Sequence, residues 1–70
     1  MRPKFYTRVT WRDGSQTRNI GGTKHDQIGN AQYEASKGGV TAEIVRVDSA
    51  GERVVMRYWR DSEGLQYLEY

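Results

Sequence analysis

The chain has 70 residues, of which 36% are hydrophobic, and its 11 basic and 9 acidic residues give a formal net charge of +2. This length predicts one small domain over residues 1–70, with a thin core and little room for a deep catalytic cleft. The absence of cysteine excludes disulfides and thiolate metal ligands, and the longest apolar run, Val54 to Met56, is too short to span a membrane.

A half-buried strand is predicted over residues 4–12, because apolar and polar residues alternate there. One side carries Phe5, Thr7, Val9 and Trp11, and the other carries Tyr6, Arg8, Thr10 and Arg12. Asp13-Gly14 is typical of a two-residue hairpin turn. That turn pairs Thr7 with Ile20, which predicts Ile20 on the apolar side.

A helix is predicted from Thr23, whose side chain can cap the first turn, with Asp26 beside the positive end of the helix dipole. It should run to about Lys37 and end at Gly38-Gly39. The inner stripe is Ile28, Ala31 and Ala35, at helical spacing.

Three strands are predicted after the helix, joined by turns at residues 49–52 and 61–64. Pairing Asp48 with Arg53 places Val45 beside Met56 on the helix side. A three-residue loop that closes with a glycine bulge at Gly64 pairs Tyr58 with Leu68 on that side and Trp59 with Tyr67 on the other.

The predicted fold class is therefore α+β, with the order β-β-α-β-β-β and one helix packed on one face of an antiparallel sheet. The predicted core comprises Phe5, Val9, Trp11, Ile20, Ile28, Ala31, Ala35, Val45, Val47, Val54, Met56, Tyr58 and Leu68.

Chemistry-bearing patterns are few. His25 is the single histidine, so the usual zinc ligands are missing. The serines have no evident base partner, and Gly21-Gly22 and Gly38-Gly39 do not match a phosphate-loop pattern. We therefore expect neither an enzyme nor a bound metal or cofactor.

The sheet face opposite the helix combines arginine with aromatic residues, a composition enriched in protein interfaces. The candidate partner-binding residues on this face are Tyr6, Arg8, Arg12, Arg46, Arg57, Trp59 and Tyr67. Arg57, Trp59 and Tyr67 are expected at its centre, with Arg8 and Arg12 at the rim. The same composition can also stack bases and hold phosphates, or form an ordinary solvated face.

The order of elements resembles that of small phage-encoded anti-CRISPR proteins that inhibit type I-F surveillance complexes. The resemblance rests on a first strand, a helix ending in Ala35-Ser36-Lys37, a strand over residues 44–48, and a hairpin through Tyr58 with acidic turn residues before Gly64. It implies a non-enzymatic inhibitor in the cytoplasm of a bacterial host. The resemblance further implies that the protein binds a Cas backbone subunit and interferes with DNA recognition. Because a net charge of +2 makes a poor mimic of DNA, we expect any such block to come from contacts at acidic positions such as Asp61 and Glu63, or from steric cover.

A small nucleic-acid-binding protein that uses the same face is the alternative. In either case we expect no membrane association, and a monomer or a weak dimer.

Overall fold

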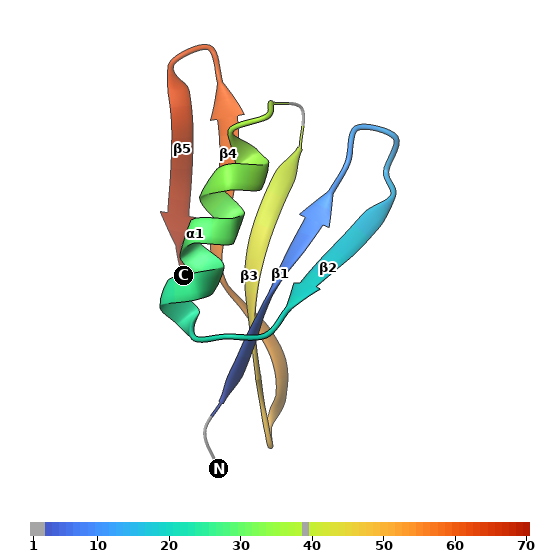
Figure 1. The fold of residues 1–70 in the computed structure, drawn as a ribbon, viewed down its shortest axis with the longest axis vertical. Helices are drawn as coiled ribbons and strands as arrows, with labels where there is room; N and C mark the ends of the chain where they lie inside the picture. Colours follow the sequence, from blue (N-terminus) through green and yellow to red (C-terminus); the bar gives the residue numbers. More distant parts are fainter. Residues whose placement is uncertain (1–2, 39) are drawn as a thin grey trace.

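The computed structural model describes residues 3–38 and 40–70, which form five strands and one helix (Figure 1). The elements are β1 (Lys4–Thr10), β2 (Gln16–Ile20), α1 (Lys24–Ala35), β3 (Thr41–Asp48), β4 (Gly51–Asp61) and β5 (Gly64–Glu69). The strands form one antiparallel sheet in the order β2-β1-β3-β4-β5. This confirms the predicted α+β fold. No helix of the described residues is long and apolar enough to cross a membrane.

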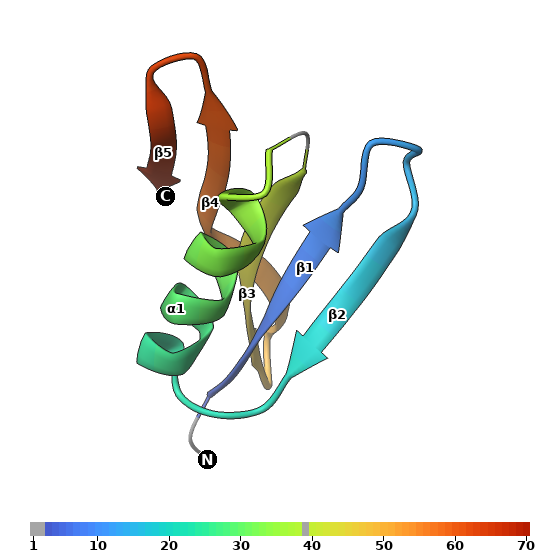
Figure 2. The ribbon, with the colours of Figure 1, turned by 45° about the horizontal axis from the view of Figure 1, so that its top comes forward.

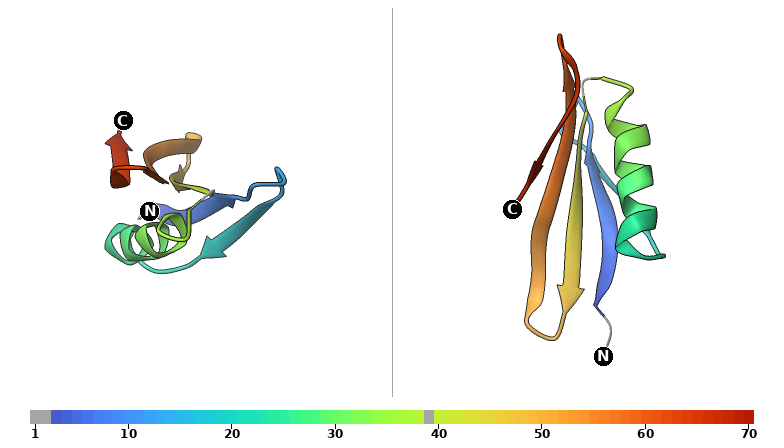
Figure 3. Two further views of the ribbon diagram at one scale, coloured as in Figure 1. Left: turned by 90° about the horizontal axis from the view of Figure 1, so that it is seen from above. Right: turned by 90° about the vertical axis from the view of Figure 1, so that its left-hand side faces the viewer.

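Helix α1 packs on one face of the sheet, against β1, β3 and β4 (Figure 3). Ala31 and Ala35 of the helix and Ala42 of β3 are completely buried. Small side chains at these positions allow the helix to lie close to the sheet. The core on this side consists of Val9, Ala31, Ala35, Val40, Ala42, Ile44, Met56 and Tyr58, with Phe5, Trp11, Ile28 and Val55 partly buried against it.

The start of α1 is fixed by a capping box, as the sequence predicts for Thr23. The Thr23 hydroxyl accepts the Asp26 backbone N–H, and the Asp26 carboxylate accepts the Thr23 backbone N–H at 2.9 Å. The Thr23 backbone hydrogen bond, with that of its side chain, lowers the pKa of Asp26. Gly22 lies close against this box, because an added Cβ would stand 2.6 Å from Asp26 Oδ2.

A buried glutamine ties the helix to the sheet. Gln27 is fully buried, and its Oε1 accepts the Thr7 hydroxyl of β1 at 2.7 Å. Its Nε2 donates to the Gly21 carbonyl in the loop before the helix. The predicted apolar stripe of α1 did not include this residue. The helix ends earlier than predicted, at Ala35 with Ser36 as its cap, and the predicted stop at Gly39 lies outside the described residues.

The first hairpin differs from the prediction by one residue. The Trp11 N–H donates to the Ser15 carbonyl at 2.8 Å, which closes a three-residue loop with Gly14 at φ 87°. The Asp13 carboxylate accepts the N–H and hydroxyl of Ser15 and stabilises this wider turn, and the same bonds lower the pKa of Asp13. Because a shift of one residue exchanges the faces of a strand, Ile20 pairs with Tyr6, faces away from the helix and is 75% exposed.

The pairing of β3 with β4 also differs from the prediction. Asp48 pairs with Gly51 across a two-residue turn, and a β-bulge interrupts the ladder between Ile44 and Val45. Ile44 pairs with Met56 on the helix side, whereas Val45 pairs with Val54 on the other face. Val47 follows Val45 onto that face, so the predicted core positions of these three valines on the helix side are wrong.

In the third hairpin, Asp61 pairs with Gly64 across a two-residue turn instead of the predicted three-residue loop. Tyr58 therefore pairs with Tyr67, and Arg57 pairs with Leu68. Leu68 lies away from the helix and is 47% exposed, so its predicted place in the core is wrong.

Candidate binding face

The face of the sheet opposite α1 is called the open face here, and none of the described elements covers it (Figure 3). The registers of β1, β3 and β4 place a central group of side chains on it: Tyr6, Arg8, Glu43, Val45, Arg57 and Trp59. Three adjacent strands therefore supply this group, and the sheet ladder fixes the spacing of its members.

An arginine–glutamate–arginine triad lies at the centre of the open face. Glu43 of β3 pairs across the ladder with Arg8 on one side and Arg57 on the other. Arg8 Nη2 lies 3.1 Å from Glu43 Oε1, and Arg57 Nη2 lies 3.4 Å from Glu43 Oε2. The Glu43 side chain is 11% exposed, against 30% for Arg8 and 45% for Arg57. One desolvated carboxylate thus orients two arginines whose outer edges remain in water.

The triad adjoins an apolar area on the same face. Tyr6 and Val45 are 5% and 2% exposed. The Arg18 guanidinium of β2 lies 5.1 Å from the centre of the Tyr6 ring, a cation–π contact that covers the ring. Trp59 is half-buried, two residues beyond Arg57 on β4. Tyr6 and Val45 are therefore buried within the face, and Trp59 offers aromatic surface beside oriented hydrogen-bond donors.

Four of the seven candidate residues lie on the open face: Tyr6, Arg8, Arg57 and Trp59. Arg8 lies in the centre, not at the rim, because it shares Glu43 with Arg57. Arg46 was predicted on this face but pairs with Phe5 on the helix side, where its Nε lies 3.3 Å from Asp48 Oδ2. Tyr67 also lies on the helix side, and its ring stacks on that of Tyr58 at 5.7 Å.

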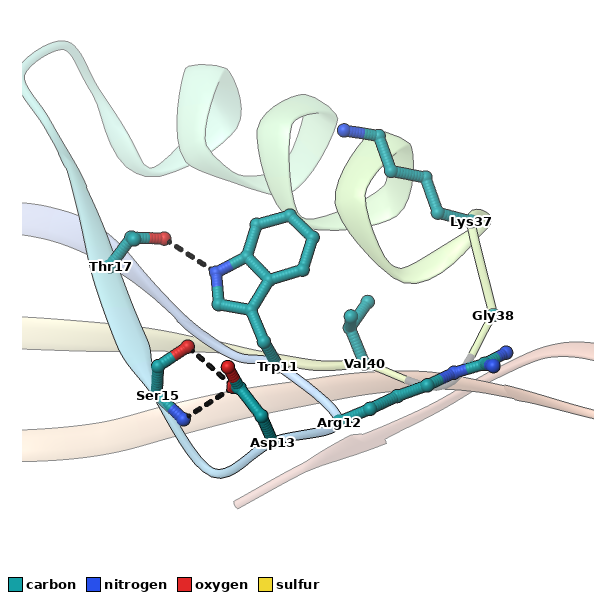
Figure 4. Close-up of a pocket in the computed structure, with 8 residues that line it drawn as sticks. All are labelled: Trp11, Arg12, Asp13, Ser15, Thr17, Lys37, Gly38 and Val40. Atoms are coloured by element: carbon teal, nitrogen blue, oxygen red, sulfur yellow. Dashed lines mark hydrogen bonds between the residues drawn. The ribbon is translucent and has the colours of Figure 1, made fainter.

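Arg12, the seventh candidate, lies in the β1–β2 loop beside a hollow of about 640 Å³ (Figure 4). Trp11 contributes the aromatic surface of this hollow, and its Nε1 donates to the Thr17 hydroxyl at 3.1 Å. The Lys37 ammonium lies 5.7 Å from the Trp11 ring centre. The Asp13 carboxylate also lines this hollow, which lies apart from the triad.

Glu43 and Val45 are the central residues that sequence reasoning missed. An acidic residue in a strand gives no sign of its partners until the register is known. Once Arg8 and Arg57 are placed opposite Glu43, the pairing of charges follows directly.

The acidic residues Asp61 and Glu63 are exposed in the β4–β5 turn, where Asp61 Oδ1 accepts the Glu63 N–H at 2.8 Å. Within residues 3–38 and 40–70, no group of three or more His, Cys, Asp or Glu side chains could hold a metal ion.

Comparisons of this chain with protein-family models, with curated proteins and with solved structures find no match.

Proposed function

We propose that this protein is a non-enzymatic inhibitor that binds a CRISPR–Cas surveillance complex through its open face and interferes with DNA recognition. The supporting observation is the Arg8–Glu43–Arg57 triad beside the half-buried Trp59. Partly buried arginines and aromatic rings supply most of the binding energy in many protein interfaces. Because Glu43 already orients both guanidiniums, a partner meets them with little further loss of side-chain entropy.

A protein partner fits this face better than nucleic acid does. Phosphate binding requires free cationic donors, and here a carboxylate occupies one side of both central arginines. The negative charge of Glu43 also repels a phosphate placed between them. A protein surface can instead present a carboxylate or carbonyl to the outer edge of each arginine and an apolar group to Trp59.

The choice of a Cas subunit as partner rests on the resemblance in element order described from the sequence. With a net charge of +2, the protein is a poor mimic of DNA. Interference would therefore come from covering the DNA path, or from contact of Asp61 and Glu63 with cationic groups that hold DNA.

The test measures DNA binding by purified type I-F surveillance complex in the presence of this protein. We expect the wild type to bind the complex and to reduce its affinity for target DNA. The Arg57→Ala/Trp59→Ala variant should bind the complex at least about tenfold more weakly, because it removes two central contacts. Tyr33→Ser is the matched control, since Tyr33 is a 66% exposed aromatic residue on the helix.

Three outcomes would contradict the proposal, and each concerns a different part of it: the partner, the surface or the class of ligand. If the wild type neither binds the complex nor changes its DNA binding, the proposed partner is wrong. If both variants inhibit like the wild type, the open face is the wrong surface. If the isolated protein binds DNA or RNA with an affinity that falls steeply between roughly 50 and 200 mM salt, the nucleic-acid alternative replaces the proposal.

A further inference from the structure

The strands β2 and β5 form the two edges of the sheet (Figure 2). They differ in the side chains that protect an edge strand from pairing with another chain. On the edge strand β2, the cation Arg18 occupies the middle position, and a central charge opposes self-pairing. β5 contains a single charge, Glu69, close to its end. Its side chains Leu65, Tyr67 and Leu68 are 42%, 65% and 47% exposed. By these criteria β5 is the unprotected edge.

The backbone of β5 presents free hydrogen-bonding groups at this edge. Tyr70 N–H donates to the Val55 carbonyl at 3.0 Å, so the pair of Tyr70 and Val55 is a hydrogen-bonded pair of the β4–β5 ladder. Such pairs alternate along an antiparallel ladder, so Gly64, Gln66 and Leu68 direct their groups to β4. Leu65 and Tyr67 then direct N–H and C=O outward, where no strand of the described residues pairs with them.

We infer that β5 pairs antiparallel with β5 of a second copy of this chain, about a two-fold axis that passes through Tyr67. In this register Tyr67 faces Tyr67 of the second copy, and Leu65 faces the aliphatic part of Glu69. Tyr70 faces Gly64, where a glycine leaves room for the aromatic ring. The outward groups of Leu65 and Tyr67 gain the partners that they lack in the monomer.

Side-chain packing favours this register. Tyr67 already stacks on Tyr58 at 5.7 Å, so self-pairing places the two Tyr67 rings between the two Tyr58 rings in one aromatic row. Shifting the axis to Gln66 would instead bring Glu69 opposite Glu63 of the second copy.

The charges also permit the pairing. In the register centred on Tyr67, the two Glu69 residues lie four residue positions apart, which is roughly 14 Å along the strands and beyond the screening length of physiological salt. Lys24 lies 3.9 Å from Glu69 within each copy and compensates its charge further. A two-fold axis perpendicular to the sheet would join two five-stranded sheets into one, with both open faces directed to the same side.

Sedimentation of the wild type over increasing concentration tests the dimer, and disulfide trapping tests its register. Because the chain has no cysteine, Tyr67→Cys introduces a single thiol. Across the axis the two Cα atoms would be about 5.5 Å apart, within the range that a disulfide bridges. We expect a concentration-dependent dimer, and rapid oxidation of Tyr67→Cys to a covalent dimer.

Asn19→Cys, on the opposite edge strand β2, is the matched control and should cross-link slowly. Tyr67→Lys, which brings two like charges together, should abolish the dimer while circular dichroism shows an unchanged fold. A wild type that stays monomeric up to about 1 mM overturns the inference. Equal cross-linking at Asn19→Cys and Tyr67→Cys, or faster cross-linking at Asn19→Cys, also overturns it.

Discussion

Both faces of the sheet bury polar side chains, and these are satisfied in different ways on the two faces. Under the helix, Gln27 is completely buried and finds its partners in Thr7 and Gly21. On the open face, Glu43 is 9% exposed and is held by two arginines whose outer edges reach water. A covered face therefore demands neutral groups with complete internal bonding, whereas an open face can hold a charge whose counter-charges remain hydrated.

The largest effect is expected on the covered side. Gln27→Leu removes the side-chain acceptor of the Thr7 hydroxyl, which keeps only the longer contact to the Gln27 backbone carbonyl at 3.3 Å, and it removes the donor to the Gly21 carbonyl. The free energy of unfolding should therefore fall by about 1–3 kcal/mol. Urea denaturation measures this loss. Because Thr7→Val removes the hydroxyl that has lost its shorter hydrogen bond, the Thr7→Val/Gln27→Leu variant should lose less stability than the sum of the two single changes. A Gln27→Leu variant as stable as the wild type would contradict the role of this network.

A smaller effect is expected from Glu43→Gln on the open face, which removes the charge shared by Arg8 and Arg57. The loss should be about 1–2 kcal/mol, because both guanidiniums can turn to water. This loss should shrink as salt is raised, whereas the effect of Gln27→Leu should not change, because its network carries no charge. If the stability losses of Glu43→Gln and Gln27→Leu depended equally on salt in urea denaturation, charge would not distinguish the polar group of the open face from that of the covered face.

The smallest effect is expected at the start of the helix, where the pKa of Asp26 lies below its ordinary value near 3.8. Since folding lowers this pKa, the carboxylate stabilises the protein above about pH 3.8, and the contribution disappears as pH falls through the lower folded value. Thermal melts of Asp26→Asn should therefore differ from those of the wild type at pH 6 and converge toward them in acid. A difference that persists unchanged at low pH would show that the charge of Asp26 is not responsible.

The elements and their order could be predicted from the sequence because strand alternation, the Thr23 cap and the glycine-containing turns are local signals. The pairing of strands could not. The loop of the first hairpin is one residue longer than predicted, that of the second is two residues shorter, and that of the third is one residue shorter. In the first turn, Ser15 donates two hydrogen bonds to the Asp13 carboxylate and stabilises a three-residue loop. The turn preference of the dipeptide Asp13-Gly14 gives no indication of these bonds.

The errors in strand register also explain why some candidate site residues were predicted on the wrong face of the sheet. Ile44 and Val45 are both apolar and both buried, so hydrophobicity does not distinguish the side that faces the helix. The exchange of these two residues moves Arg46 off the open face, and the shorter β4–β5 turn moves Tyr67 to the helix side. Arg8, Arg57 and Trp59 were placed on the correct face because their neighbours alternate clearly.

The close approach of helix and sheet at Ala31, Ala35 and Ala42 also limits which substitutions this protein can accept during evolution. Any larger side chain at these three positions must push the helix away from the sheet, which disturbs every contact along it. The interior is therefore a poor source of new activity. Substitutions on the open face and along β5 meet solvent instead, so new binding specificities can arise there while the fold is retained.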